Sequence, residues 1–318
     1  MAKIDHDNLL HQAARALAHS GSYKTRYNHS VEVKRFVKIL RAKGFGVSKW
    51  EKVINKHVRA VVSQWKSRGL KPATLKEYLS GVRAVAKYYG NDRIAATNAA
   101  FRIPNRKYVS NRDGSLPDHV YNATVTALKE SMEPNDHRVA AQMQLQRELG
   151  LRMEESYKFS ARRDVLADGR VLVAGGTKGG RERVILVVSE KGWEAIEYAR
   201  QVGDGRNGNL IPREMSEKQW KDLCYRILRR NGVTKAEAGA SSHGLRHAYA
   251  QERYRQITGY ECRAKFGSQG EFRAAARTAA GADWAQLDHD ARQILKPEMG
   301  HGPDRNDVVS QYLGSSTS

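Results

Sequence analysis

Four short stretches between residues 150 and 312 gather residue types that could act on a phosphodiester. They are GLRMEE at 150–155, TKGG at 177–180, HGLRH at 243–247, and GH at 300–301 followed by Tyr312. Displacement at a phosphodiester builds negative charge on oxygen, so the reaction needs fixed cations. Arginine suits this need because its planar fork donates twice to phosphate and stays charged. A tyrosine could be the nucleophile if a proton acceptor lies within hydrogen-bond reach. Each stretch alone is common, whereas all four in this order indicate one site.

The chain is strongly basic, and its positive charge is concentrated in the first third. The 318 residues include 55 Lys and Arg against 34 Asp and Glu, a net charge of +21. Residues 1–110 hold 23 basic and 6 acidic residues, a net of +17, whereas residues 111–318 carry a net of only +4. Such a surface can neutralise several phosphates and release counterions. We therefore predict a nucleic-acid partner for the first part, the alternative being a solvated basic face with no partner.

Several classes of protein are excluded. No run of 18 apolar residues exists, and residues 1–20 lack the apolar stretch of an export signal, so we expect a cytoplasmic chain without a membrane span. Cys224 and Cys262 lie 38 residues apart, which argues against a cysteine-based zinc site. His289 lies between Asp288 and Asp290, but adjacent residues on a helix face apart, so we interpret this segment as a solvated face rather than a metal site.

The first 112 residues predict a small helical domain. Apolar residues recur at helical spacing over 24–42, 49–67 and 71–90, with a shorter helix near 8–18. Trp and Tyr at these spacings are interpreted as core residues rather than as platforms on which bases stack.

A basic linker is predicted over residues 103–118, where the helical pattern lapses into Pro, Asn, Gly and charged residues. Residues 113–318 then predict a second domain. Two β-rich runs around a glycine-rich turn at 170–188 predict a hairpin. Helices are predicted over 117–131, 136–148, 191–202, 217–231, 243–258, 283–295 and 306–313. We therefore expect a mainly α fold with a small β-hairpin, in which a helical domain precedes a mixed α/β domain.

The order of the motifs resembles that of the tyrosine recombinase (phage integrase) family across essentially the whole chain. On this resemblance, residues 1–112 are similar to the family's core-type DNA-binding domain and residues 113–318 to its catalytic domain, the two forming a C-shaped clamp. The matching catalytic positions are Arg152, Lys178, His243, Arg246, His301 and Tyr312, with Glu155 as the acid three residues after the first arginine.

The resemblance implies a reaction that needs no ATP, metal ion or other cofactor. Arg152 and Arg246 would bind the non-bridging oxygens of the scissile phosphate. Tyr312 would attack the phosphorus and form a covalent 3′-phosphotyrosine, which keeps the energy of the phosphodiester for rejoining.

The remaining matched residues would move protons or orient their neighbours. His243 would accept the proton of the phenol, Lys178 would donate one to the departing 5′ oxygen, and His301 would donate a hydrogen bond to the phosphate. Glu155 would fix the orientation of an arginine or histidine. His247, which follows the second arginine, is interpreted as structural or as a helper. Contacts to DNA are predicted for Arg181, Lys71, Lys76, Arg83, Arg106 and Lys107.

Two features depart from the family pattern: one spacing between motifs and the length of the segment after Tyr312. Arg246 and His301 lie 55 residues apart, more than in most of the family, which predicts a basic insertion at about 253–283. This insertion could contact DNA or another protomer, or could be a surface excursion. Only six residues follow Tyr312, so the family's C-terminal tail, which docks on the next protomer, is expected to be absent or replaced.

The resemblance implies a site-specific recombinase, an integrase of a phage or other mobile element in a bacterial or archaeal host. Its expected partners are double-stranded attachment or core sites, with DNA-bending or excisionase proteins as possible accessories. We expect a homotetramer on synapsed DNA and a monomer or dimer when free. The alternatives are a type IB topoisomerase-like enzyme and a non-catalytic DNA-binding protein of the same fold.

Overall fold

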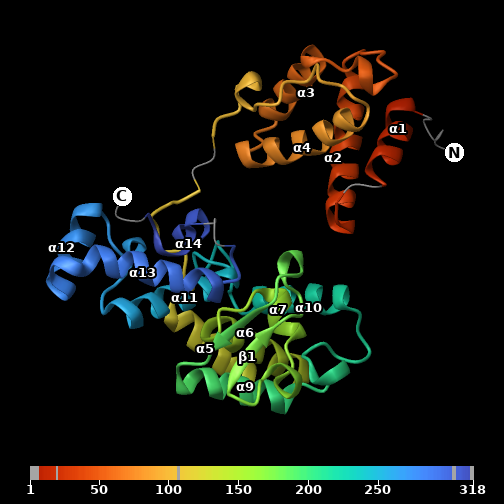
Figure 1. Cartoon of the computed structure of the whole chain (residues 1–318). Coiled ribbons are helices and arrows are strands. Elements are labelled where there is room, and N and C mark those ends of the chain that lie inside the picture. Colours follow the sequence, from red (N-terminus) through yellow and green to blue (C-terminus); the bar gives the residue numbers. More distant parts are fainter. Residues whose placement is uncertain (1–6, 19–20, 106–107, 303–305, 316–318) are drawn as a thin grey trace. The chain divides into compact units, whose positions relative to one another are not determined.

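The computed structural model describes residues 7–18, 21–105, 108–302 and 306–315. The chain divides into two compact units, Met1–Lys107 and Tyr108–Ser318 (Figure 1). Both are mainly helical, and a single two-stranded antiparallel sheet occurs among the described residues, which confirms the predicted fold class. None of the described helices combines the length and the apolar composition that a membrane span requires.

Four α-helices build the first unit. They are α1 (Asn8–Leu17), α2 (Tyr23–Ala42), α3 (Asn55–Ser67) and α4 (Pro72–Tyr88), joined by the short 3-10 helices η1 (Trp50–Lys52) and η2 (Ala99–Phe101). The predictions at 8–18, 24–42 and 71–90 are thereby confirmed.

The single helix predicted over 49–67 is wrong. Val53 and Ile54 are extended between η1 and α3. The buried amide of Asn91 donates hydrogen bonds of 2.6 Å to the Trp50 carbonyl and 2.8 Å to the Val53 carbonyl. Because these two carbonyls accept hydrogen bonds from Asn91, the helix can be interrupted there without leaving buried polar groups unpaired.

Aromatic residues form the centre of the first unit. Trp50 and Trp65 are fully buried, and their rings lie 6.0 and 6.3 Å from that of Phe36. Their interpretation as core residues is confirmed. Tyr27 in α2 and Tyr88 at the end of α4 are exceptions, since both are exposed.

The second unit contains ten α-helices and one hairpin among its described residues. The helices are α5 (Asp118–Glu130), α6 (Pro134–Glu148), α7 (Met153–Lys158), α8 (Ala161–Asp164), α9 (Glu190–Val202), α10 (Glu217–Arg230), α11 (His243–Thr258), α12 (Gln269–Ala280), α13 (Trp284–Glu298) and α14 (Asn306–Leu313). Four 3-10 turns are η3 (Lys178–Gly180), η4 (Arg206–Gly208), η5 (Arg263–Lys265) and η6 (Gly281–Asp283). The predicted hairpin is confirmed as β1 (Arg170–Val173) paired with β2 (Arg183–Leu186), with Arg170 opposite Leu186.

The first hydrophobic core of this unit surrounds α6. This helix is packed against α5, α7, α9, α10 and α11, and buried residues occur all around it. A helix that is buried on every side is held in place by its packing, so it fixes the positions of the helices around it. The chain leaves α6 at Gly150, where the motifs of the candidate site begin.

A second core joins α11 to α14 and includes the predicted insertion. Residues 253–283 complete α11 and form η5, α12 and η6. The side chains of Tyr260, Cys262 and Phe272 in this segment are buried together with Leu295 of α13 and Leu313 of α14. The insertion is therefore part of the core rather than a surface excursion.

Candidate active site

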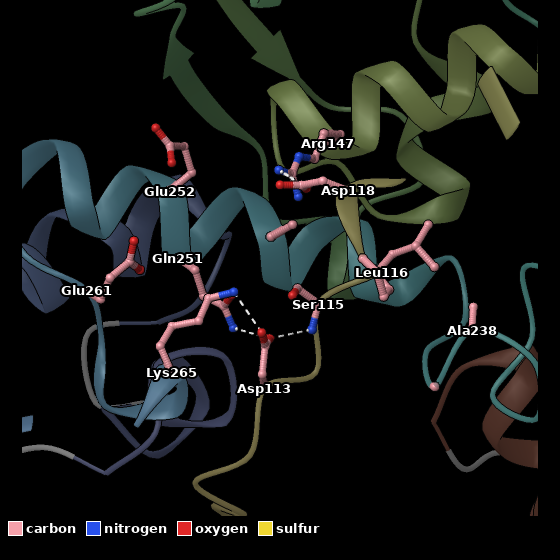
Figure 2. Close-up of a pocket in the computed structure, with 13 residues that line it drawn as sticks. Asp113, Ser115, Leu116, Asp118, Arg147, Ala238, Gln251, Glu252, Glu261 and Lys265 are labelled. Atoms are coloured by element: carbon pink, nitrogen blue, oxygen red, sulfur yellow. Dashed lines mark hydrogen bonds and ion pairs between the residues drawn. The ribbon is translucent and has the colours of Figure 1, made fainter. Parts of the chain in front are cut away.

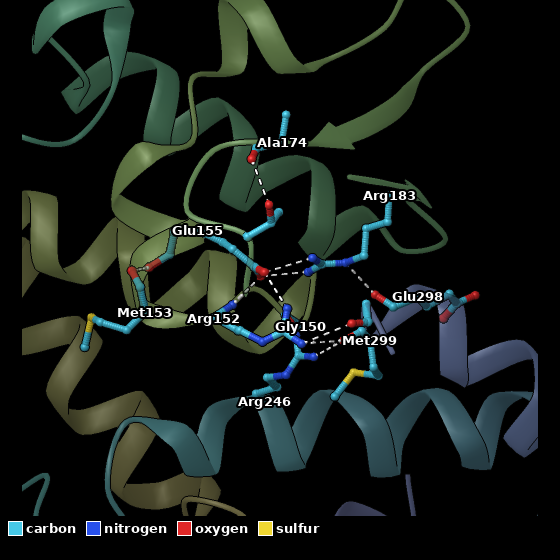
Figure 3. Close-up of polar contacts among 12 residues, drawn as sticks. Gly150, Arg152, Met153, Glu155, Ala174, Arg183, Arg246, Glu298 and Met299 are labelled. Atoms are coloured by element: carbon cyan, nitrogen blue, oxygen red, sulfur yellow. Dashed lines mark hydrogen bonds and ion pairs between the residues drawn. The ribbon is translucent and has the colours of Figure 1, made fainter. Parts of the chain in front are cut away.

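The turn after α6 places Arg152 at the start of α7. Gly150 has a φ of +61°, and a Cβ there would lie 2.3 Å from the ring of Tyr249, so this sharp, closely packed turn requires glycine. Arg152 is the N-cap residue of α7, and its backbone N–H donates a 2.7 Å hydrogen bond to Glu155. The turn thereby directs the Arg152 side chain toward the last residues of α13 (Figure 3).

Glu155 lies between two guanidinium groups (Figure 3). The carboxylate is 1% exposed and accepts a 2.5 Å hydrogen bond from Arg152 Nη1 and bonds of 2.9 and 2.7 Å from Arg183 Nη1 and Nη2. Burial acts to raise the pKa of Glu155, but the hydrogen bonds and charge of Arg183 and the charge of Arg152 outweigh it and lower the pKa to about 2. Glu155 is therefore ionised throughout the physiological range and holds both arginines.

The end of α13 supplies further acceptors for the arginines. The Met299 carbonyl accepts from Nη2 of Arg152 at 3.1 Å and from Nη2 of Arg246, and the Glu298 carbonyl accepts from Nε of Arg183 at 2.8 Å. The last carbonyls of a helix have no partner within the helix and carry partial negative charge. Three cationic side chains thus converge on one helix end, as Figure 3 shows.

Arg246 joins this cluster to Tyr312. Arg246 is 1% exposed on α11, its Nη1 donates to the Gly150 carbonyl, and its Nε lies 3.2 Å from Tyr312 Oη. Burial lowers the pKa of Arg246, but an arginine stays charged even after a substantial shift. The phenol therefore accepts a hydrogen bond from a buried cation.

Three imidazoles surround the Tyr312 ring. The ring centroids of His247, His243 and His301 lie 4.7, 5.8 and 6.0 Å from that of Tyr312. His243 is exposed at the surface, yet enough protein surrounds it to disfavour the imidazolium, and Arg246 and Arg152 repel that charge, so its pKa is lowered to about 4. Burial likewise lowers the pKa of His247 to about 4, aided by His243. Both imidazoles are neutral near pH 7 and can accept a proton.

The structure brings Arg152, Glu155, His243, Arg246, His301 and Tyr312 into one constellation within the second unit. The backbone of Lys178 lies in η3 on the hairpin turn, and its side chain lies outside the described residues. Arg181 lies close to Gly302, because a Cβ at Gly302 would be 2.5 Å from Arg181 Nη1. The Arg181 side chain thus lies against Gly302, next to His301.

The residues predicted to contact DNA from the first unit differ in their surroundings. Lys71 is exposed, and Lys76 Nζ lies 3.4 Å from Asn105 Oδ1. The guanidinium of Arg83 donates to the Ala95 and Thr97 carbonyls and to the Asn98 side chain, which favours a structural role. Arg106 and Lys107 lie outside the described residues.

Sequence reasoning did not predict that Arg183 pairs with Glu155, although a signal for an inward-facing side chain exists. In β2, Arg183 and Ile185 are buried whereas Val184 and Leu186 are exposed. Alternation along a strand puts Arg183 on the inward face, where an arginine needs a carboxylate.

The segment around His289 needs a correction. Asp288 is not solvated: it is buried and accepts hydrogen bonds from Tyr254 and Arg292, whereas His289 and Asp290 are exposed. Within the described ranges, no group of three His, Cys, Asp or Glu side chains is placed to hold a metal ion.

Glu155 predicts an acid-sensitive contribution to folding. Because its pKa falls from 4.5 to about 2 on folding, its contribution is complete above about pH 4.5 and is lost as the pH falls toward 2. A shift of this size corresponds to about 3 kcal/mol. We expect the unfolding midpoint in urea, followed by circular dichroism, to fall more steeply between about pH 5 and pH 2.5 in the wild type than in Glu155→Gln. Glu197→Gln, at an exposed ion pair, should match the wild type, and parallel profiles for the wild type and Glu155→Gln would contradict this role of Glu155.

Comparison with known protein families covers both units. A family model described as "Phage integrase, N-terminal" matches residues 1–95, and a model described as "Integrase" matches residues 109–252. Tyrosine recombinase XerD of Pseudomonas putida is 26% identical over 196 residues, which are 58% of this chain and 62% of that protein. The chain therefore matches less than two thirds of the length of this curated relative.

Solved structures with similar folds include integrases bound to DNA. A lambda integrase dimer on a COC′ core site aligns with a TM-score of 0.61 at 17% identity, over 96% of this chain and 75% of that one. The Tn1549 transposon integrase with a circular-intermediate DNA aligns with a TM-score of 0.59 at 14% identity, over 97% of this chain and 96% of that one. A lambda integrase tetramer on a Holliday junction aligns with a TM-score of 0.56 at 18% identity, over 89% of this chain and 77% of that one. The two family models match sequence in both units, and the second covers the motifs around Arg152, Lys178 and Arg246, so the chain belongs to the tyrosine recombinase (phage integrase) family.

Proposed function

We propose that this chain is a site-specific DNA recombinase, the integrase of a phage or other mobile element, that cuts and rejoins DNA through a covalent 3′-phosphotyrosine. The observation that carries the proposal is the 3.2 Å hydrogen bond from Arg246 Nε to Tyr312 Oη. This bond places the buried guanidinium of Arg246 within hydrogen-bond distance of the phenol oxygen that would attack the phosphorus. Arg152 shares the Met299 carbonyl with Arg246, so a second guanidinium lies beside the first.

The arginine cluster suits a phosphate group. Arg152 Nη2 donates to two backbone carbonyls, of Met299 and Gly300, and its side chain is partly exposed. A phosphate oxygen carries more charge than a carbonyl and would compete for these donors. Arg246 would stabilise the negative charge that develops on Tyr312 Oη as the phenolic proton leaves.

The proposed reaction balances without an external energy source. The Oη of Tyr312 bonds to the phosphorus, and the bond from phosphorus to the 5′ oxygen breaks. The phenolic proton passes to neutral His243, and Lys178 protonates the departing 5′ oxygen, while His301 donates a hydrogen bond to the phosphate. One phosphodiester replaces another, so a 5′-hydroxyl can reverse the step on the same or a different strand. ATP and a metal ion are not needed.

The first unit would supply most of the affinity for DNA. Residues 1–110 carry a net charge of +17, and Lys71 and Lys76 are the described residues that we propose as phosphate contacts. Both units would bind the same core site. Assembly into a tetramer during strand exchange is proposed by analogy with the lambda integrase tetramer on a Holliday junction. Accessory DNA-bending proteins and a bacterial or archaeal cytoplasm belong to the same proposal.

The proposal is tested with a library of duplexes that have a randomised core and a nick beside it. Cleavage near the nick releases a short fragment, so religation fails and the covalent intermediate accumulates. We expect the full chain to form an SDS-resistant adduct in EDTA and without ATP, attached to a 3′ end and leaving a free 5′-hydroxyl. Sequencing the trapped duplexes would then identify the core site.

Two results would contradict the proposal. A chain that binds the library but never forms an adduct is a non-catalytic DNA-binding protein. Attachment to a 5′ end, or dependence on ATP or a metal ion, would require different chemistry.

A further inference from the structure

Asp113 lies at the meeting point of three segments near the start of the second unit (Figure 2). One carboxylate oxygen accepts hydrogen bonds of 3.0 Å from Gln251 Nε2 and 2.8 Å from the Ser115 backbone N–H. The other accepts a 2.7 Å bond from Lys265 Nζ. Asp113 thereby joins α11, through Gln251, to the insertion, through Lys265.

Gln251 extends this connection to the residue that would attack DNA. Its side chain is buried, and the same Nε2 that donates to Asp113 donates at 3.2 Å to the backbone carbonyl of Tyr312. An amide nitrogen carries two hydrogens, and both of its partners here are acceptors, so the nitrogen must face them. Helix α11 therefore holds Tyr312 twice, at the phenol through Arg246 and at the backbone through Gln251.

The insertion also contacts the end of α14 directly. Gly314, with a φ of +83°, follows α14, and a Cβ there would lie 2.9 Å from the backbone nitrogen of Ala264 and 3.0 Å from Arg263 Cβ. The backbone N–H of Ser315 donates a 2.6 Å hydrogen bond to Asn111 Oδ1. The residues that follow α14 thus contact both η5 and the segment that contains Asp113.

We propose that Asp113 is a positioning residue that, through Gln251 and Lys265, fixes the tyrosine-bearing helix within the same chain. The inference rests on the proposed function, since it assigns the insertion the task of holding Tyr312 in line with the phosphorus. Asp113 stays charged, because the hydrogen bonds from Lys265, Ser115 and Gln251 outweigh its burial and lower its pKa to about 2. A misplacement of about 1 Å in the attacking oxygen can slow a reaction by about 100-fold.

The test compares two variants of Asp113 on a nicked duplex that carries the core site recovered from the library. Asp113→Ala removes both acceptors, whereas Asp113→Asn keeps an oxygen for Gln251 and Ser115. At saturating protein, we expect Asp113→Ala to form the adduct about 10- to 100-fold more slowly than the wild type. Asp113→Asn should recover most of that rate. The Kd for the duplex should stay within about twofold in both variants, because Asp113 is not proposed to contact DNA.

Glu197→Ala is the matched control. Glu197 on α9 also accepts from one basic side chain, Arg200, and one glutamine, Gln201, and it has no contact with Tyr312. Its loss should leave the adduct rate unchanged. The midpoint of thermal unfolding is measured for each variant, and adduct rates are measured well below the lowest of these midpoints. A slower rate then reports misplacement of Tyr312 and not loss of folded protein.

A substrate with sulfur in place of the bridging 5′ oxygen distinguishes positioning from proton transfer. A thiolate is a good leaving group without protonation, because the pKa of a thiol is near 8.5. The sulfur substrate should restore the rate of Lys178→Ala but not that of Asp113→Ala.

Three outcomes would overturn the inference: an unchanged adduct rate in Asp113→Ala, an equal loss in Glu197→Ala, or full rescue of Asp113→Ala by the sulfur substrate. In each of them the wild type still forms its adduct, so the proposed function stands. A wild type that forms no adduct on any duplex overturns both proposals.

Discussion

Replacing Tyr312 with phenylalanine is expected to reduce covalent adduct formation below detection while DNA binding stays within about twofold of the wild type. The substitution removes one oxygen and leaves the ring among the three imidazoles. The lost hydroxyl leaves Arg246 Nε without its acceptor, at a cost to stability of about 1–3 kcal/mol. Adducts are counted on denaturing gels, and binding is followed by fluorescence anisotropy on the intact duplex.

Tyr260→Phe is the control for this prediction. Tyr260 is buried in the same hydrophobic core, and its hydroxyl donates a 2.5 Å hydrogen bond to the Trp284 carbonyl. Its loss should cost similar stability without reducing the adduct. An adduct in Tyr312→Phe at the wild-type rate would place the nucleophile elsewhere in the chain.

Arg246→Lys is expected to lower the rate of adduct formation by about 10²- to 10³-fold, the effect of removing one preorganised donor from a developing anion. Lysine keeps the charge but lacks the planar fork that reaches the Gly150 carbonyl, the Met299 carbonyl and Tyr312 Oη together. The rate at saturating protein should fall more than the affinity for DNA, because the lost donor acts on charge that develops during attack.

Arg253→Lys is the matched control for the second prediction. Arg253 lies two turns further along α11 and forms an ion pair with Glu298 at 3.3 Å, without contact to Tyr312. We expect its adduct rate to stay near that of the wild type. Equal rates for Arg246→Lys and the wild type would show that Arg246 holds the fold without assisting the reaction.

The motifs could be found from the sequence because each occupies a short, regular piece of chain. His243 and Arg246 lie three residues apart at the start of one helix, and Arg152 and Glu155 are separated by the same interval. At this spacing, helical geometry puts two side chains on one face. Patterns of this kind depend on local structure, which sequence periodicity describes well.

The acceptors that hold the arginines could not be predicted in this way. Backbone carbonyls of Gly150 and Met299 accept from Arg246, and every residue type has such a carbonyl. Their use depends on where α13 ends relative to α11, which is a property of tertiary packing. The break between η1 and α3 was missed for a related reason, since its carbonyls are satisfied by Asn91, more than 30 residues away.

The insertion shows where a resemblance stops being informative. The spacing between Arg246 and His301 predicted extra residues and left their role open. The structure buries Tyr260 and Phe272 against the core that contains Tyr312, a set of contacts that no linear motif encodes. The role of this segment therefore had to come from the contacts around Asp113.

The most direct test of the account is to locate the covalent bond in the wild-type adduct. After trapping on the nicked core-site duplex, the DNA is digested to a short nucleotide, the protein is cleaved by trypsin, and the modified peptide is sequenced by mass spectrometry. The account predicts a 3′-linked nucleotide on Tyr312 in the peptide that covers 306–318, the product of trypsin cleavage after Arg305. A nucleotide on any other side chain, with Tyr312 unmodified, would contradict it.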